Sequence, residues 1–255
     1  MGTHPSGPSY AVAPDGEEIL LSELLRQSPE YSGTMSVIEK YGSDLPFLFK
    51  VLSINEPLSI QSHPDKELAK KLHATDPKNY PDENHKPEMA IALTEMELLC
   101  SFRPHDQIVE SIMNYSELGS IVQQERFNNY LNASNESGRK SCLKECFKSI
   151  IEAEDETVRE AVRSLVQKFS TQSFQTNDIQ KLFLRVAQKY PQDVGCLCLF
   201  FLNYLKLQPF EAVFLPANEP HSYISGGKRL SFQTCLSYLR NGFESSLSSL
   251  LKKFL

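Results

Sequence analysis

The sequence has neither a long apolar run nor a cluster of basic residues. Its longest uninterrupted apolar stretch, Cys196–Leu202, is far shorter than the roughly 20 residues that a membrane-spanning helix needs. Its 32 acidic residues outnumber the 26 basic ones and give a net charge of -6, so the chain lacks the positive surface with which proteins bind nucleic acids or anionic membranes. We therefore expect neither a nucleic-acid partner nor a membrane partner.

The sequence also lacks a disulfide framework and a signal peptide. Six cysteines in 255 residues are too few for a disulfide-stabilised scaffold, and reduced thiols are the simpler interpretation. The opening residues, Met1–Gly7, contain no apolar segment of the kind that directs secretion. Both features indicate a cytoplasmic protein. The cysteines stand at positions 100, 142, 146, 196, 198 and 235.

What is present is an ordinary globular composition, 40% hydrophobic and 23% charged, with enough material for a buried core. Apolar runs predict strands at 47–54 and 212–215, and alternating side chains predict a strand at 88–94. The segment 97–103 is expected to pair with the strand at 88–94. Apolar residues at helical spacing predict a short helix at 17–27.

Between residues 105 and 190 the apolar period becomes helical, as in Val158, Val162 and Leu165. We therefore predict a mixed β + α fold in which an all-helical domain is inserted into a β domain. The stretch 193–207 is strongly apolar, and its composition fits a buried helix or a strand equally well. The predicted divisions are a β region at 1–104, helices at 105–190, a return to the β domain at 191–226, and a Ser/Leu-rich tail without a chemical motif at 227–255.

The segment Leu58–Asp65 is the most informative stretch for function. Its residues alternate, so a strand there would project Gln61 and His63 together from one face. An amide oxygen and an imidazole aimed into the same space form half of a plausible metal site. Asp65 is suited to cap a helix that begins directly after it.

Four side chains form a candidate metal set: Gln61, His63, Glu88 and His221. Zinc accepts imidazole nitrogen and carboxylate oxygen, and three or four such ligands with one open position make a catalytic site. The positions are widely scattered, so spacing alone also allows ordinary roles. His63 and Glu88 could be solvated strand residues, and His221 a turn residue.

Two lysines are candidate catalytic residues. Lys86 lies two residues before Glu88, so an extended backbone places its ammonium beside the proposed ligand, where a cation would lower its pKa. Lys50 lies inside an apolar strand, where burial would have the same effect. An ordinary solvated lysine is the alternative for Lys86. Cys142 and Cys146, four residues apart on a predicted helix, have no accompanying ligand and are interpreted as small core residues.

Several long segments resemble the type I mannose-6-phosphate isomerases, also called phosphomannose isomerases. The resemblance covers roughly residues 1–226, and its motifs are long and specific. The matching segments are Thr-His-Pro-Ser-Gly at 3–7, Leu-Ser-Ile-Gln-Ser-His-Pro-Asp-Lys at 58–66, Tyr-Pro-Asp-Glu-Asn-His-Lys-Pro-Glu-Met-Ala-Ile-Ala-Leu-Thr at 80–94, Phe-Arg-Pro at 102–104, and Ala-Asn-Glu-Pro-His-Ser-Tyr-Ile-Ser-Gly at 217–226.

The resemblance implies a cupin-like (jelly-roll) β domain with a helical insertion, and one zinc ion per chain. It implies interconversion of mannose 6-phosphate and fructose 6-phosphate in mannose and GDP-mannose metabolism. In that family the zinc ligands fall on the positions of Gln61, His63, Glu88 and His221. Moving a proton between C1 and C2 through a cis-enediol requires a base, for which Lys86 or Lys50 is the candidate. Ser59 shares the face of Gln61 and His63 and is the candidate substrate-binding residue.

The sequence also departs from the family pattern, and we expect a monomeric chain that is shortened at both ends, with an incomplete cupin-like domain. An Arg-Ala-Gly-Leu-Thr-Pro-Lys run, expected to act on the substrate or its phosphate, is replaced by a tail whose Lys228, Arg229 and Arg240 do not reproduce it. A catalytically impaired metal-binding remnant is therefore an alternative. A weaker alternative makes the helices at 105–190 a protein-interaction module.

Overall fold

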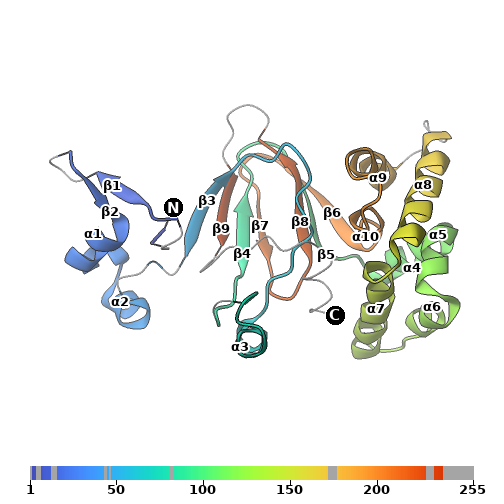
Figure 1. Cartoon of the computed structure of the whole chain (residues 1–255), viewed down its shortest axis with the longest axis horizontal. Coiled ribbons are helices and arrows are strands. Elements are labelled where there is room, and N and C mark those ends of the chain that lie inside the picture. Colours follow the sequence, from blue (N-terminus) through green and yellow to red (C-terminus); the bar gives the residue numbers. More distant parts are fainter. Residues whose placement is uncertain are drawn as a thin grey trace.

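The computed structural model describes residues 2–3, 7–12, 16–42, 45, 47–80, 83–171, 177–227 and 233–237 (Figure 1). A small N-terminal unit lies at one end of the molecule. Its strands β1 (Tyr10–Val12) and β2 (Glu18–Leu20) pair antiparallel. Three short helices follow: α1 (Leu21–Gln27), the 3-10 helix η1 (Pro29–Ser32) and α2 (Met35–Tyr41). The helix predicted at 17–27 is thus shorter at its start, where β2 stands.

Two antiparallel sheets form the middle of the molecule. In the first, the strand order is β3 (Leu48–Leu52), β9 (Gln233–Ser237), β4 (Glu88–Ile91) and β7 (Ala212–Leu215). In the second, it is β6 (Leu202–Leu207), β5 (Met96–Phe102) and β8 (His221–Gly226). Ala90 and Leu215 of the first sheet share one buried apolar cluster with Leu98 and Tyr223 of the second, so the sheets pack face to face.

The strands predicted at 88–94 and 97–103 do form, but the prediction that they pair with each other is wrong. β4 pairs with β7 and β9, whereas β5 lies at the centre of the other sheet between β6 and β8. Alternation reports which face of a strand is buried and carries no information about its neighbour. The short connection after β4 crosses from one sheet to the other.

The tail predicted at 227–255 contributes β9, which lies between β3 and β4. Leu247, Leu250, Leu251 and Phe254 have the spacing of an amphipathic helix in the sequence, and they lie outside the described residues. No local pattern marked β9 because both of its partners are far away in the sequence, and pairing of this kind is decided by the rest of the sheet.

The helical region follows β5, and its apolar stripes converge on one core. Phe169 contacts Phe183 edge to face with ring centroids 5.4 Å apart, and Phe200 lies 5.5 Å from Phe183. The helices are α4 (His105–Asn114), α5 (Ser116–Val122), α6 (Gln124–Leu131), α7 (Glu136–Ile151), α8 (Asp155–Thr171), α9 (Asp178–Lys189) and α10 (Gly195–Cys198). The mixed fold with a helical insertion is confirmed. The apolar stretch at 193–207 contains both elements that were considered, α10 and then β6.

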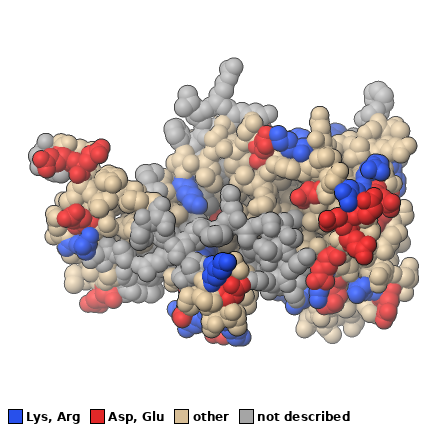
Figure 2. All heavy atoms as spheres, in the orientation of Figure 1, with Lys and Arg blue, Asp and Glu red and all other residues tan. Residues whose placement is uncertain are grey.

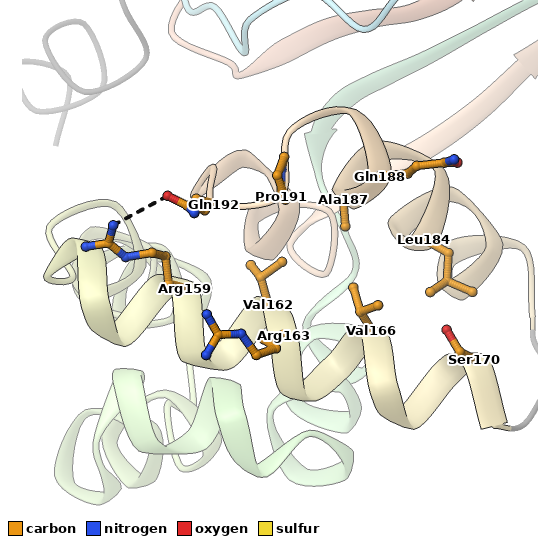
Figure 3. A pocket seen from close by; sticks show the side chains of 10 residues that line it. All are labelled: Arg159, Val162, Arg163, Val166, Ser170, Leu184, Ala187, Gln188, Pro191 and Gln192. Carbon is orange, nitrogen blue, oxygen red and sulfur yellow. Dashed lines mark hydrogen bonds between the residues drawn. The ribbon is translucent and has the colours of Figure 1, made fainter.

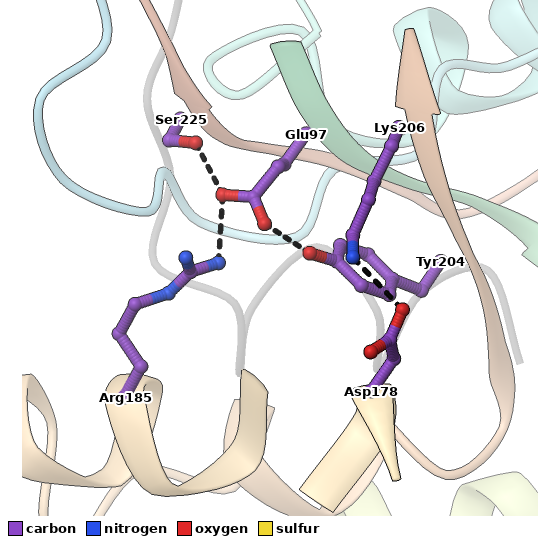
Figure 4. Close-up of polar contacts among 6 residues, drawn as sticks. All are labelled: Glu97, Asp178, Arg185, Tyr204, Lys206 and Ser225. Atoms are coloured by element: carbon purple, nitrogen blue, oxygen red, sulfur yellow. Dashed lines mark hydrogen bonds and ion pairs between the residues drawn. The ribbon is translucent and has the colours of Figure 1, made fainter. Parts of the chain in front are cut away.

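The helical region is packed against the outer face of the second sheet (Figure 1). Leu99 of β5, Ile224 of β8 and Ile60 belong to the same buried cluster as the helices. A polar junction accompanies this contact (Figure 4): Arg185 of α9 donates to Glu97 Oε2 of β5 at 2.7 Å, and Tyr204 and Ser225 also donate to that carboxylate. Ser225 lies on β8, which also carries His221, so this junction connects the helices to that strand through Glu97.

A groove of about 490 Å³ runs between α8 and α9 in the helical region (Figure 3). Its apolar side chains include Val166 and Leu184, and Arg159 reaches across to Gln192 at 3.4 Å. None of its lining residues belongs to the set predicted for function. They are Arg159, Val162, Arg163, Val166, Ser170, Leu184, Ala187, Gln188, Pro191 and Gln192.

Acidic and basic side chains are interspersed over the helical region on the face shown in Figure 2. Within the described part of the chain, no helix combines the length and the apolarity required to cross a bilayer.

Candidate metal centre

The segment that carries Gln61 and His63 runs antiparallel along the edge of β8, but it is not the regular strand predicted. Leu58 N–H donates to Tyr223 O at 2.9 Å, and Gln61 and His221 exchange two backbone hydrogen bonds of 2.8 Å. Only Gln61 is part of a β-bridge. The alternation still predicts part of the arrangement, because Ile60, which alternates with Gln61, is buried in the core of the helical region.

Three candidate ligands meet at one point, although they come from three separate segments. His63 precedes α3 (Lys66–Thr75), Glu88 opens β4 and His221 opens β8. The Nε2 atom of His63 lies 3.2 Å from Glu88 Oε1, and that of His221 lies 3.5 Å from Glu88 Oε2. One ligand atom from each residue lies within 4.8 Å of the others. The face-to-face packing of the sheets brings them together.

Glu88 is buried, and its surroundings favour the carboxylate form. Burial by itself would raise the pKa of Glu88, but hydrogen bonds and charge from His221 and His63 outweigh it and hold the pKa well below the ordinary value. Tyr223 donates from its hydroxyl to Glu88 Oε2 at 3.2 Å. A negative charge is thus maintained between two imidazoles.

Gln61 joins this group through its backbone. In an antiparallel pair, two residues that exchange both hydrogen bonds project their side chains from the same side. Gln61 and His221 are such a pair. The Gln61 amide therefore leaves the backbone on the side of the His221 imidazole, where it can supply a neutral oxygen.

The donor set fits a zinc ion. The Nε2 atoms of His63 and His221 are buried, and apart from their approach to the Glu88 carboxylate neither makes a well-aligned hydrogen bond to a described residue. Such atoms are costly to bury unless something binds them. Ligands at zinc distances in tetrahedral geometry are separated by roughly 3.3 Å, and the observed separations from Glu88 are 3.2 and 3.5 Å. Two imidazoles and one carboxylate are ligands that zinc accepts, and the neutral amide oxygen of Gln61 would be an unusual fourth.

The two predicted catalytic lysines lie on different elements of the β domain. Lys50 on β3 and Ala90 on β4 are both paired with Cys235 of β9, so they lie in one row of the sheet. Glu88 is two residues from Ala90 and projects from the same face, which makes it the face of Lys50 as well. Lys86 is half-buried in the loop that leads into β4.

Ser59, the predicted substrate-binding residue, is exposed and borders a cavity of about 260 Å³. Tyr190 of α9 and Ser222 of β8 also line this cavity. Ser222 alternates with His221 along β8, so the cavity touches the side of that strand that faces the helices. The cations considered for the substrate phosphate, Lys228, Arg229 and Arg240, lie outside the described residues.

Two residues of the site were missed by sequence reasoning. Tyr223 could have been found, since it stands two residues after the candidate ligand His221 and would share its face on a strand. Asn218 contacts the backbone of His63 at 2.7 Å, and only the tertiary structure shows this contact.

Comparison with known proteins agrees with this geometry. Residues 1–105 match the family model described as phosphomannose isomerase type I, catalytic domain, and residues 118–202 match that of the helical insertion domain. Mannose-6-phosphate isomerase 1 of Arabidopsis thaliana is 42% identical over 231 residues, which cover 89% of this chain and 53% of the relative. The human mannose-6-phosphate isomerase is 40% identical over 232 residues, covering 89% and 55%. The chain thus spans about half the length of the curated relatives it matches.

Solved structures resemble the fold. A histidine-to-alanine mutant of phosphomannose isomerase from Salmonella typhimurium superposes with a TM-score of 0.81 at 27% identity, covering 98% of this chain and 63% of that one. A zinc-bound mannose 6-phosphate isomerase gives a TM-score of 0.76 at 26% identity, covering 99% and 64%. Since two domain models of one family match most of the sequence and the fold agrees, the chain belongs to the type I phosphomannose isomerase family.

Proposed function

We propose that this chain carries the zinc centre of an aldose–ketose isomerase that interconverts mannose 6-phosphate and fructose 6-phosphate. The observation that carries the proposal is the convergence of His63, Glu88 and His221, whose ligand atoms lie within 4.8 Å of one another. Relatives that share about 40% of the sequence are named mannose-6-phosphate isomerases, and one structural neighbour holds zinc. In this proposal Gln61 completes the ligand set, with one zinc ion per chain.

A zinc ion at this position would act as a Lewis acid that polarises the oxygens at C1 and C2 of the sugar. The residues of the chain have distinct tasks around it. Glu88 supplies the negative charge, and Tyr223 orients that carboxylate through the 3.2 Å hydrogen bond to Oε2. The Gln61–His221 bridge holds two ligands side by side.

Isomerisation also requires a base that moves a proton between C1 and C2. Lys86 is supported by its position two residues before Glu88 and by its partial burial. Lys50 is supported by the row that it shares with Ala90 on the face that carries Glu88. Ser59 remains the candidate for contact with the substrate.

The test is to measure zinc content and mannose 6-phosphate turnover on one sample of the purified 255-residue chain. The proposal expects one zinc per chain and activity that chelation removes. Glu88→Gln should lose zinc and activity together, while Glu95→Gln, a change at an exposed position near β4, should lose neither. Absence of zinc from the folded wild-type chain would refute the metal centre, and zinc without turnover would refute the isomerase activity of this chain.

The two lysines can be separated by kinetics. Lys86→Met should lower kcat about 100-fold or more if Lys86 is the base, with zinc content unchanged, because general base catalysis contributes roughly 10²–10⁴-fold. Lys50→Met should do so if Lys50 is the base. Lys70→Met, at an exposed position on α3, is the matched control. Full activity in both variants would exclude both lysines.

The proposal also includes a cytoplasmic monomer that acts on a hexose 6-phosphate. The cytoplasmic location is supported by five cysteines that carry free thiols among the described residues. No observation on the described residues favours the alternative of an inactive metal-binding remnant.

A further inference from the structure

Asn218 lies in the turn between β7 and β8 and has an unusual backbone. Its φ of 64° falls in the left-handed region, which asparagine tolerates better than most residues because its short side chain can form local hydrogen bonds. Its side chain is exposed, yet all of its polar groups are engaged with one segment of the chain. That segment begins at His63.

Three hydrogen bonds join Asn218 to the segment. Its backbone N–H donates to His63 O at 2.7 Å. Its Oδ1 accepts from Asp65 N–H at 3.0 Å, and its Nδ2 donates to Asp65 Oδ2 at 2.7 Å. Asp65 in turn accepts from Leu68 N–H at 2.8 Å, which caps the start of α3. The turn that follows His63 is thereby tied to the turn that precedes His221.

Along the chain, the Gln61 bridge comes before His63, and the contacts with Asn218 begin at His63 and continue after it. Gln61 joins its strand to His221 two residues before His63, and Asn218 holds the backbone at His63 and beyond. Together the two attachments fix the position of the His63 backbone relative to His221. A metal site depends on such fixation, because ligands must be held close to the binding geometry by the groups around them.

We propose that the Asn218 side chain is a positioning residue for the metal centre, which through Asp65 sets the placement of His63 relative to His221. This inference rests on the proposed zinc site. Asn218 is not itself a ligand, since its Oδ1 accepts from Asp65 N–H and its Nδ2 is a donor.

The variant that isolates the side chain is Asn218→Gly. Glycine adopts positive φ freely and keeps the N–H that donates to His63 O, so only the amide contacts to Asp65 are lost. The matched control is Asn79→Gly. Asn79 is also an exposed asparagine, and its Nδ2 donates to Asp76 at 2.9 Å at the other end of α3, away from the ligands.

Two properties of the full chain are measured: the zinc Kd, by competition with a chromogenic chelator, and the visible absorption spectrum of the cobalt-substituted protein. We expect Asn218→Gly to raise the zinc Kd about tenfold, the lower end of the effect seen for residues that support metal ligands. The cobalt spectrum should change because the ligand geometry changes. Asn79→Gly should alter neither property.

An unchanged zinc Kd and cobalt spectrum in Asn218→Gly would overturn the inference, and so would equal weakening by both variants, since that indicates general destabilisation. If Asn218→Gly does not fold, Asn218→Asp decides by the same two readouts, because aspartate also tolerates positive φ but opposes the Asp65 carboxylate. A folded wild-type chain without zinc affinity would refute the proposed function itself. Zinc binding that is insensitive to Asn218 refutes only this inference.

Discussion

The carboxylate of Glu97 should be the main polar attachment between the helical region and the second sheet. Glu97 accepts hydrogen bonds from Arg185, Tyr204 and Ser225, and its side chain is 14% exposed (Figure 4). Burial alone would raise the pKa of Glu97, but the hydrogen bonds and charge of these partners, Arg185 foremost, lower it below the ordinary value. Glu97→Gln is the perturbation that removes the charge while keeping the shape.

The expected cost follows from the contacts. Hydrogen bonds to a charged group contribute roughly 1.5–3 kcal/mol and neutral ones roughly 0.5–1.5, so each of the three bonds weakens by about 1 kcal/mol. The Arg185 side chain is 50% exposed, so solvent screening reduces its share. The sum is a loss of about 2 kcal/mol in the free energy of unfolding.

The assay is urea unfolding of the wild-type chain and Glu97→Gln, followed by circular dichroism at neutral pH and in steps down to about pH 3. Because the folded pKa of Glu97 is lowered, its contribution is complete above the ordinary glutamate pKa and disappears as pH falls through the folded value. The difference between the proteins should therefore shrink on acidification.

Asp178→Asn is the control. Asp178 pairs with Lys206 at 2.8 Å in the same junction, but both side chains are largely exposed, so its loss should leave the unfolding midpoint nearly unchanged. Equal stability of Glu97→Gln and the wild type at neutral pH would refute the reasoning. So would a difference that persists unchanged in acid.

Three further predictions concern the metal centre, the thiols and a helix cap. Zinc at 100 times its Kd should stabilise the chain by about 2.7 kcal/mol, measured as a thermal shift that a chelator reverses and that Glu88→Gln abolishes. Burial raises the pKa of Cys146 to about 12, so this thiol should resist a disulfide reagent in the native protein at neutral pH, while the half-buried Cys142 reacts first, as mass spectrometry can show. Asn177 and Gln180 form a capping box at the start of α9, so Asn177→Ala should cost about 1 kcal/mol in urea unfolding, and an unchanged midpoint would contradict this.

Local periodicity predicted the elements well because it reflects local physics. The apolar runs at 47–54 and 212–215 correspond to β3 and β7, and the 3.6-residue spacing corresponds to the helices from α4 to α9. Asp65 caps α3 as expected, accepting from Leu68 N–H at 2.8 Å. In each case the signal and the structure involve residues close in the chain.

Partnership between distant segments could not be predicted in the same way. The segment 58–63 has the alternation of a strand, yet only Gln61 forms a bridge. Few backbone groups of this segment are hydrogen-bonded to β8, the strand beside it. β9 had no recognisable pattern, yet it lies between β3 and β4. The chemical types of the ligands were visible in the sequence, while their proximity depends on how the two sheets pack.

On β8, the strand that carries His221, the direction of a side chain depends on how the strand pairs with β5 and not on the sequence alone. Strict alternation along β8 would place Ser225 on the face of His221 and Tyr223, towards the interior of the sandwich. The register instead shifts between Glu97 and Leu98: Glu97 is paired with Ser225 and Leu98 with Tyr223, so Ile224 is an extra residue on β8. A bulge of this kind lets two consecutive residues face the same way.

The consequence is that one short strand serves two surfaces. Tyr223 stays beside Glu88 in the metal centre, and Ser225 turns to the Glu97 carboxylate at the helical junction. Without the bulge, Ser225 would be aimed into the apolar interior and Glu97 would lose a donor. The metal centre and the attachment of the helices are therefore linked through the register of β8, so a change at the Glu97 junction should also be felt at His221.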